Sequence, residues 1–425
     1  MKRRSLLLGI LAVGALAAGG AVVSRPEDEG APYDDYFRTL NAELRRNGPM
    51  RPCMVVDLDR LDHNIDAVTL AVRAPKKRFR VVAKSLPSAG LIAYVFKRAA
   101  TDRLMSFHQP FLNADAQNFP DAEILLGKPL PARSAQLFYQ QHKGTLDPAR
   151  QIQWLIDTPQ RLQQYLELAN ALGTPMRINI EIDVGLHRGG VVNPAALGQL
   201  LGLIAANPQR LSFAGFMGYD PHVVKIPRVL GTPEQLFADS MARYQDCVDL
   251  LRREHAGLWR DDLTFNGAGS PTYALHTAET LTNDLSVGSG LVKPTDFDVP
   301  TLDAHVPACF IATPVLKAHP GLLIPGLEQK SAIFSWWDPN QRETFFIYGG
   351  NWMANYESPR GLRRNDLFGH SSNQEIATAS PAVGIGVDDH VFLRPTQSEA
   401  VFLQFGDLVA VRGGRIEQSW PVYVG

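Results

Sequence analysis

The sequence predicts an α/β protein that consists of a closed (β/α)₈ TIM barrel followed by a mainly-β domain. Two observations carry this prediction. Short apolar runs rich in β-branched residues alternate with stretches of helical periodicity across residues 79–287, as expected for parallel strands joined by helices. Beyond about residue 300 long helical patterns are absent and strand-like runs recur between turn signals, which indicates a β domain.

Length, charge and cysteine content narrow the class of protein. A chain of 425 residues exceeds one ordinary domain and is long enough for two. The formal net charge is −1 and no basic patch or nucleic-acid motif is visible, so binding to nucleic acid is not expected. The three cysteines, Cys53, Cys247 and Cys309, form no CxxC pair, so a disulfide or zinc framework is not expected.

Residues 1–24 have the pattern of a targeting segment. Lys2-Arg3-Arg4 precedes an apolar run, and the small residues Ala15-Leu16-Ala17 fit a cleavage site. The order Arg3-Arg4-Ser5-Leu6-Leu7 is similar to a twin-arginine signal. A membrane anchor is the alternative, because the apolar run approaches spanning length. We therefore expect an exported protein, periplasmic or membrane-anchored, in which residues 25–51 form a linker and an N-terminal extension.

The barrel is predicted over residues 52–299. An earlier strand, Cys53–Leu58, is surplus to the eight and could pair with the second domain. Helical periodicity between the strands is clear in Pro159–Leu172 and Thr232–His255. The eight predicted barrel strands are Phe79–Ala83, Leu104–Phe107, Glu123–Leu126, Ile152–Ile156, Arg177–Ile182, Phe213–Met217, Leu263–Phe265 and Asp284–Val287.

The second domain is predicted over residues 300–425. The pair Gly413-Gly414 lies between two strand-like runs and suits a hairpin turn. The strand-like runs are Ala308–Leu316, Lys330–Trp337, Thr344–Tyr348, His390–Leu393, Ala400–Leu403 and Leu408–Arg412.

Lys84 is the residue around which the predicted site is organised. It ends an apolar, β-branched run, where an ammonium group is costly to bury unless it is paired or neutralised. Desolvation lowers the pKa of such a lysine and suits it to act as a Schiff-base nucleophile. The simpler alternative is a lysine that reaches out to solvent at a strand end.

Further polar groups follow other predicted strands. Because barrel active sites form at the C-terminal ends of the strands, Arg188, Tyr219 and His222 are expected near Lys84. The glycine-rich turns Asn266–Ser270 and Gly288–Gly290 follow the last two strands, where barrels commonly hold a phosphate on backbone N–H groups. A strand-end lysine beside such turns predicts pyridoxal 5′-phosphate (PLP), an aldehyde cofactor that carries a phosphate.

Several segments resemble fold-type III PLP enzymes of the alanine racemase N-terminal type, and in particular the D-threonine aldolase and D-serine dehydratase branch. They are Pro52–Asp59, Val82–Ser85, Glu181–Val191, Gly215–His222, Asn266–Ser270 and Phe405–Val422. The resemblance implies that Lys84 is the Schiff-base lysine and a base. It also implies that Arg188 contacts the phenolic oxygen of the cofactor and that Tyr219 lines the cofactor site and takes part in catalysis. The residues that would hold the phosphate are Gly267, Gly269, Ser270, Gly288 and Ser289.

Two of these roles have structural alternatives. The resemblance implies that His222 is an acid or base opposite Lys84, but it could instead be a structural histidine. Arg188 could form a salt bridge with Asp183 at the barrel mouth in place of a cofactor contact.

The sequence departs from the family pattern at the expected metal site. The branch usually carries a His-x-Cys or His-x-Asp metal pair near the C-terminus, whereas Gln397 and Glu399 occupy the matching positions here. Their oxygens favour Mg²⁺ or Mn²⁺, or no ion at all. In the family that metal engages the substrate β-hydroxyl, so the cofactor is a firmer expectation than the reaction.

The expected activity is that of a PLP-dependent lyase on a D-amino acid that carries a β-hydroxyl. The alternatives are an amino-acid racemase, with Lys84 and either His222 or Tyr219 as the two bases, and a PLP-binding protein without catalytic activity. The resemblance also implies a homodimer whose β domain completes the partner's active site.

Overall fold

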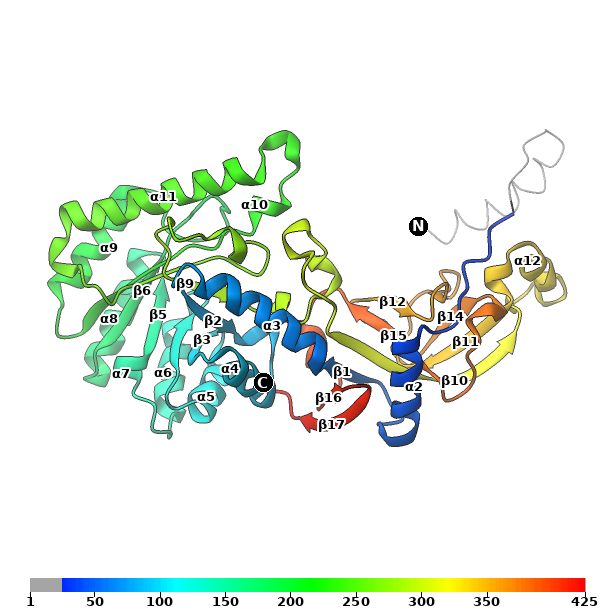
Figure 1. Cartoon of the computed structure of the whole chain (residues 1–425). Helices are drawn as coiled ribbons and strands as arrows, with labels where there is room; N and C mark the ends of the chain where they lie inside the picture. Colours follow the sequence, from blue (N-terminus) through cyan, green and yellow to red (C-terminus); the bar gives the residue numbers. More distant parts are fainter. Residues whose placement is uncertain (1–24, 425) are drawn as a thin grey trace. The chain divides into compact units, whose positions relative to one another are not determined.

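The structure is a computed structural model and is described here over residues 25–424 (Figure 1). The predicted targeting segment lies outside these residues. The chain forms two compact units. Among the described residues, the barrel unit comprises Val56–Cys309, Thr396–Ala410 and 418–424, and the second unit comprises 25–55, Phe310–Pro395 and Val411–Glu417. Among residues 25–424 no helix is both long and apolar enough to cross a membrane.

The barrel unit holds eight parallel strands that close in sequence order from β2 to β9, which confirms the predicted barrel. The predicted strands differ from the observed ones by at most two residues at either end. The strands are β2 (Arg78–Val82), β3 (Arg103–Ser106), β4 (Glu123–Leu126), β5 (Ile152–Ile156), β6 (Met176–Glu181), β7 (Leu211–Met217), β8 (Thr264–Gly267) and β9 (Asp284–Val287).

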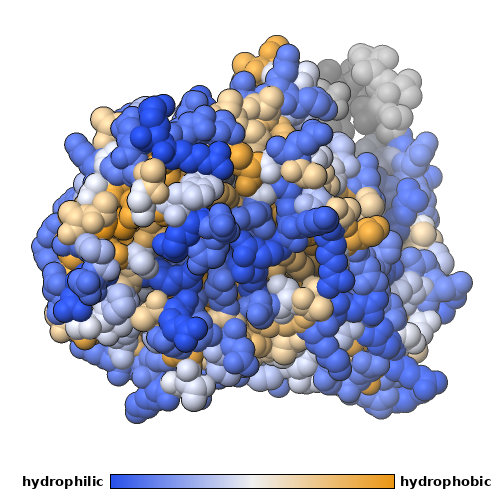
Figure 2. All heavy atoms as spheres, turned by 60° about the vertical axis from the view of Figure 1, so that its left-hand side comes forward, coloured by the Kyte–Doolittle hydropathy of each residue, from blue (hydrophilic) through white to orange (hydrophobic). Residues whose placement is uncertain are grey.

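Helices cover the outside of the barrel (Figure 1). They are α3 (Leu58–Arg73), α4 (Ala89–Ala99), α5 (Gln109–Asn118), α6 (Ala132–Gln141), α7 (Pro148–Gln151), α8 (Pro159–Leu172), α9 (Pro194–Ala206), α10 (His222–Lys225) and α11 (Pro233–Glu254). Local sequence sets their ends. Helix α11 starts in a capping box between Thr232 and Gln235, and α8 stops at Gly173, whose φ of 66° is readily adopted by glycine. With the barrel turned forward, the visible surface is mainly hydrophilic (Figure 2).

A buried ionic network fills the N-terminal end of the barrel. Arg80, which is fully buried, donates from Nε and Nη2 to the two carboxylate oxygens of Asp284 at 2.7 and 3.0 Å. Burial alone would raise the pKa of Asp284, but the Arg80 guanidinium outweighs this and lowers it. Asn266 Nδ2 also donates to Asp284 Oδ1 at 2.6 Å, which connects this network to the loop after β8.

The second unit is mainly β, as predicted. Its helices are α2 (Asp35–Asn47) and α12 (Ser331–Trp337), and α2 packs Phe37 against Phe310 and Phe392. Its strands are β10 (Cys309–Pro320), β11 (Glu343–Tyr348), β12 (Ala354–Ser358), β13 (Arg363–Arg364), β14 (Gln374–Ala379) and β15 (His390–Pro395).

Three further strands belong to the same sheet, and each contains a point at which the chain passes from one unit to the other. They are β1 (Cys53–Asp57), β16 (Leu408–Arg412) and β17 (Arg415–Trp420). The sheet order is β13-β14-β11-β10-β1-β16-β17, and β15 pairs with β10 and β12. The early strand therefore pairs in the sheet of the second domain, as the sequence indicated. Gly413 and Gly414, with φ of 54° and 73°, form the predicted turn between β16 and β17.

Two of the predicted strands are wrong. Of residues 330–337, Ser331–Trp337 form helix α12 instead, and of residues 400–403 all but the last belong to the short helix α13 (Glu399–Phe402). Both runs are apolar and short, and periodicity alone does not separate strand from helix over so few residues.

Candidate active site

A cavity lies at the C-terminal ends of the barrel strands, where a barrel carries its catalytic groups. It encloses ≈ 590 Å³ of empty space, part of which is open to solvent, within the usual range for small-molecule sites. Predicted site residues that line it are Lys84, Arg188, Tyr219, Gly269, Ser270, Gly288, Ser289 and Glu399. Those that do not line it are His222, Gly267 and Gln397.

Lys84 lies one residue into the 3₁₀ turn Ala83–Ser85, directly after strand β2. Its Nζ is 2.5 Å from Glu399 Oε1 and 4.9 Å from the centre of the Phe107 ring. The ammonium group is therefore paired with a carboxylate inside the cavity, and does not simply extend into solvent.

Arg188 and Tyr219 both line the cavity, and their side chains are in contact. The Arg188 guanidinium carbon is 4.8 Å from the centre of the Tyr219 ring, a cation–π contact. The alternative partner of Arg188, Asp183, is instead engaged by His187, whose Nδ1 lies 2.6 Å from Asp183 Oδ2. Burial would raise the pKa of Asp183, but hydrogen bonds from the backbone N–H groups of His187 and Gly185 outweigh it and lower the pKa.

The two glycine-rich turns are joined through one hydroxyl group. Ser270 Oγ accepts hydrogen bonds from the backbone N–H groups of Gly288 and Gly290 at 3.2 and 2.9 Å. Because both lone pairs are used in this way, the Ser270 O–H is left as a donor at the cavity wall. Ala268 has a φ of 67°, which is uncommon for a residue with a Cβ and marks this turn as one held by its surroundings.

Gly269 allows the turn to approach the Tyr219 ring. A Cβ at this position would lie only 2.6 Å from Tyr219 Cε2. The turns, Ser270 and Lys84 thus line one cavity, which offers small residues, hydrogen-bond donors and an amine. This arrangement fits a small aldehyde that carries a phosphate.

A second group of buried residues supports the turn after β8. No motif in the sequence indicated this group. Asp220 Oδ2 lies 2.9 Å from His276 Nε2, and Asp220 Oδ1 accepts a 2.6 Å hydrogen bond from Thr272. Thr272 Oγ1 in turn accepts the N–H of Gly269 at 3.1 Å. Gly267 belongs to this support, because a Cβ there would lie 2.6 Å from the Thr282 methyl group.

His222 lies at the start of α10 and is mostly buried. Its Nε2 is 3.3 Å from Ser240 Oγ, and its Nδ1 is buried without a hydrogen-bond partner among the described residues. Burial lowers its pKa, so the neutral imidazole is favoured. The proposed acid–base role of His222 opposite Lys84 stays a prediction.

Glu181 is a buried carboxyl group at the end of β6 that sequence reasoning did not assign a role. Burial, and then the nearby negative charge of Asp157, raise its pKa to about 7, although Arg188 acts in the opposite direction. The only sequence signal for it is its place at the C-terminal end of a barrel strand.

The two residues at the expected metal positions have different partners. The Gln397 amide donates from Nε2 to Asp296 Oδ2 at 3.0 Å, whereas Glu399 pairs with Lys84. Within residues 25–424 no group of three or more histidine, cysteine, aspartate and glutamate side chains is placed to hold a metal ion.

The fold and the site define a PLP-type barrel, and comparison with known proteins identifies the family. The family described as "Alanine racemase, N-terminal domain" matches residues 56–295, more than half of the chain. The protein therefore belongs to this family, as the sequence motifs predicted, and PLP is the cofactor expected for the fold.

Similar proteins cover nearly the whole chain. The 3-hydroxy-D-aspartate aldolase of Paracoccus denitrificans (strain Pd 1222) is 23% identical over 394 residues, which are 87% of this chain and 91% of that protein. The crystal structure of D-threonine aldolase from Filomicrobium marinum has a TM-score of 0.68 at 16% identity, covering 88% of this chain and 97% of that one. D-threo-3-hydroxyaspartate dehydratase from Delftia sp. HT23 has a TM-score of 0.65 at 17% identity, with coverage of 88% and 97%.

A racemase is similar to the same extent in structure. Alanine racemase from Bacillus anthracis has a TM-score of 0.65 at 13% identity and covers 88% of this chain and 98% of that one. Together these likenesses confirm the predicted combination of barrel and β domain.

Proposed function

We propose that this protein is a PLP-dependent lyase that acts on a β-hydroxy-D-amino acid. The observation that carries the proposal is the position of Lys84, whose amine enters a cavity bounded by Arg188, Tyr219 and the two glycine-rich turns. The names of three similar proteins, two aldolases and a dehydratase, support a lyase on this class of substrate.

The residues of the cavity have complementary roles in this proposal. Lys84 would hold the cofactor, Arg188 and Tyr219 would border its ring, and the turns Ala268–Ser270 and Gly288–Ser289 would hold its phosphate. When bound, PLP supplies an electron sink that stabilises negative charge next to the substrate amine. Lys84 must lose its ammonium proton before its nitrogen can act as a nucleophile, and Glu399 Oε1, 2.5 Å away, holds the lysine side chain in the cavity as a carboxylate partner.

Racemisation is the second candidate function. It requires one group that removes the proton from one face of the substrate carbon and another that delivers a proton to the opposite face, and the phenol of Tyr219 is a second proton-transferring group beside Lys84 in the cavity. The similarity to a solved alanine racemase favours keeping this alternative. A protein that binds PLP without turnover is the third outcome of the test below.

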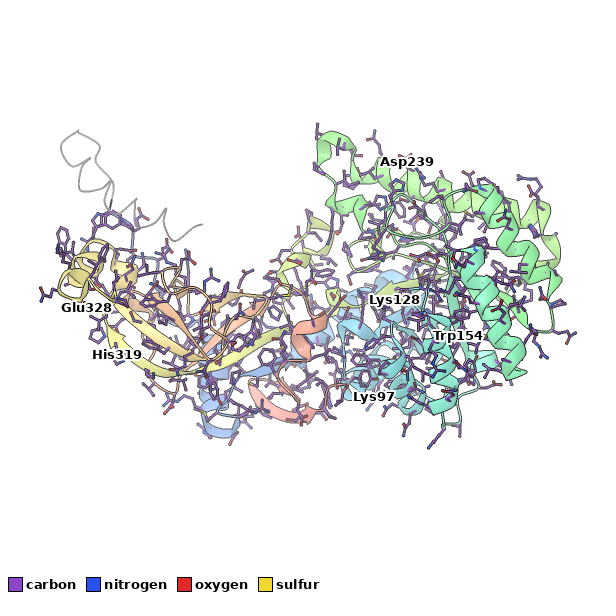
Figure 3. All side chains as sticks on the ribbon, turned by 180° about the vertical axis from the view of Figure 1, so that it is seen from behind. Lys97, Lys128, Trp154, Asp239, His319 and Glu328 are labelled. Atoms are coloured by element: carbon purple, nitrogen blue, oxygen red, sulfur yellow. The ribbon has the colours of Figure 1, made fainter. Side chains whose placement is uncertain are left out.

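The test is product analysis on the purified protein loaded with PLP. We expect D-threonine to give glycine and an aldehyde, or D-serine to give a keto acid and ammonia, and we expect both activities to be lost in Lys84→Ala. Lys97→Ala is the matched control, because Lys97 is an exposed lysine on α4 (Figure 3). Formation of the L-isomer from D-alanine alone would establish a racemase, and no product from any of them would contradict an enzyme of this class.

We also propose that the protein is exported and acts as a homodimer. Its N-terminal segment would be either cleaved or kept as a membrane anchor. The Lys-Arg-Arg start and the apolar run that follows support export. Fractionation of cells into cytoplasm, periplasm and membrane tests the first point, and light scattering of the purified protein tests the second. A divalent ion bound through Gln397 and Glu399 stays a prediction that competes with the Lys84–Glu399 ion pair, and metal analysis of the purified protein tests it.

A further inference from the structure

Glu399 is a carboxylate fixed at the cavity wall. It opens helix α13, and its Oε1 is 2.5 Å from Lys84 Nζ, although the two side chains are 38% and 36% exposed. Both line the cavity. The pair joins the lysine of the proposed cofactor site to a segment that lies far away in the sequence.

A chain of buried hydroxyl groups holds this segment against the barrel. Ser398 Oγ donates to Ser289 Oγ at 3.1 Å, and Ser289 Oγ donates to Ser85 Oγ at 3.0 Å. Ser398 is fully buried, and Ser85 and Ser289 are nearly so. Ser85 follows Lys84 in the chain, and Ser398 precedes Glu399. These hydrogen bonds therefore hold the backbone next to each member of the ion pair in place.

The charges around the cavity are unbalanced once the cofactor is present. Among the described lining residues Lys84 and Arg188 are cations and Glu399 is an anion, while the other lining side chains are uncharged. PLP would bind at the Lys84 nitrogen, and its phosphate would add nearly two negative charges. Arg188 keeps its positive charge against the Tyr219 ring, but the phosphate and Glu399 together carry more negative charge than Arg188 offsets. A negative side chain on the substrate would therefore meet an excess of negative charge.

We propose that Glu399 excludes acidic side chains and that the substrates are β-hydroxy-D-amino acids with an uncharged or cationic substituent. Met105, Phe107, Met217 and Phe297 line the same cavity and favour an apolar substituent. This inference rests on the proposed function, and it separates this chain from the two similar proteins whose names specify a hydroxyaspartate.

The test compares D-asparagine with D-aspartate, which have almost the same shape and differ in charge. Neither carries a β-hydroxyl, so binding is read from the change in absorbance of the bound cofactor and not from turnover. We expect the loaded protein to bind D-asparagine at least about tenfold more tightly, because like charges in a partly desolvated site repel each other. Added salt should narrow the difference.

Glu399→Gln should reduce the preference by tightening the binding of D-aspartate. Asp303→Asn, which removes an exposed carboxylate outside the cavity, should leave the preference unchanged. Equal binding of both amino acids by the unmodified protein would overturn this inference and leave the proposed function standing. Failure of the protein to bind PLP would overturn both. The comparison in the unmodified protein decides the question even if the Glu399 variant does not fold.

An independent observation concerns helix α12 in the second unit. Three of its seven residues are large and exposed, with exposed fractions of 61% for Ile333, 71% for Trp336 and 37% for Trp337. Leu323, in the loop before the helix, is 67% exposed. We call these four residues the α12 patch, and the turn that leads into the helix is marked by Glu328 in Figure 3.

The described chain begins against the same helix. Arg25 donates from Nε to the Trp337 carbonyl and from Nη2 to the Trp336 carbonyl, both at 3.0 Å. The twenty residues before it, 5–24, include no charged residue. This length is close to the about 20 apolar residues that span a bilayer as a helix.

We infer that the α12 patch contacts the surface of a lipid bilayer. An apolar segment of spanning length leads directly into Arg25, and Arg25 is bound to the helix that carries the patch. Tryptophans and basic residues such as Arg25 and the exposed Lys330 are the side chains found at membrane interfaces. The segment would bring the helix to the bilayer, and the tryptophans would enter its headgroup region.

The test uses the full chain reconstituted into vesicles of phosphatidylcholine and phosphatidylglycerol with brominated acyl chains, which quench nearby tryptophans. We expect part of the fluorescence to be quenched in the unmodified protein and this part to be lost in the double variant Trp336→Phe, Trp337→Phe. Trp259→Phe, which changes a tryptophan that stacks on Arg252 in the barrel unit, should keep the quenching. Equal quenching with and without Trp336 and Trp337 would overturn the inference. So would a dimer in solution that Ile333→Ser dissociates while no quenching by lipid is seen, since the patch would then be covered by a second copy.

Discussion

Replacing Gly269 by alanine should weaken PLP binding and leave the fold intact. The new Cβ would lie 2.6 Å from Tyr219 Cε2, where ordinary contacts begin at 3.4 Å. The Tyr219 ring must therefore withdraw by about 0.8 Å, and the direction open to it is the cavity that it lines. The ring can make this movement while the cavity holds only solvent, but a bound cofactor would compete for the same space.

The free-energy cost of the added methyl group should consequently appear in the PLP-loaded protein, as weaker binding of PLP. Overpacking by one methyl group typically costs about 1–3 kcal/mol, which corresponds to an increase of about 5-fold to 150-fold in the dissociation constant of PLP. The assay is an absorbance titration with PLP, and the free energy of unfolding is measured in urea without cofactor. Gly257→Ala is the control, because a Cβ at Gly257 would have no atom within 4 Å.

An unchanged affinity for PLP in a folded Gly269→Ala variant would refute the reasoning. It would mean that the Tyr219 ring does not border the cofactor, or that the turn after β8 does not hold the phosphate. A loss of stability without a loss of affinity would lead to the same conclusion.

Four other predictions follow from the contacts described above. Asp284→Ala should lower the free energy of unfolding by about 3–5 kcal/mol in urea titrations, because it removes two hydrogen bonds from the fully buried Arg80 and leaves the partly exposed Glu123 as the paired carboxylate. A change below about 1 kcal/mol would contradict this. Ser270→Ala should weaken PLP binding in the same absorbance titration, because it removes a donor and frees the N–H groups of Gly288 and Gly290, and normal affinity would count against this role. Burial raises the pKa of Asp115 from 3.8 to about 7, so the folded state binds the proton of this carboxyl group more tightly than the unfolded state does. The free energy of unfolding should therefore fall as pH rises between about 4 and 7, by at most about 1.4 kcal/mol per pH unit relative to Asp115→Asn. A difference between the two proteins that does not vary with pH would contradict this. Replacing Arg3 and Arg4 by lysine should block export if the route is the twin-arginine one, and unchanged localisation by cell fractionation would argue against that route.

The barrel was predictable because its strands are buried on both faces. Runs such as Ile152–Ile156 are short, apolar and bounded by helical segments, so periodicity and length agree on the same element. Topology alone could assign Lys84 and the two glycine-rich turns to one end of the barrel. Lys84 follows the first barrel strand, and the turns follow the last two strands. The structure places Lys84, Arg188, Tyr219 and both turns at one cavity.

The contacts between distant segments were not predictable from the same patterns. Glu399 was interpreted only as a possible metal ligand, and no local feature of the sequence pairs it with Lys84. The hydroxyl chain from Ser398 to Ser85 is likewise formed by folding, because serine carries no signal for its partner. The run 331–337 is rich in aromatic residues that favour strands, yet it forms α12, since a single turn or two of helix carries too little periodicity to be distinguished.

Reduction of the PLP-loaded protein with borohydride, followed by peptide mass spectrometry, identifies the lysine that holds the cofactor. We expect the pyridoxyl group to be attached to Lys84. Lys77 is the informative competitor, because burial lowers its pKa to about 8 and favours its neutral amine. Its amine is, however, bound to Thr280 and Thr282 away from the cavity. A label on Lys77, or on no lysine, would contradict the account.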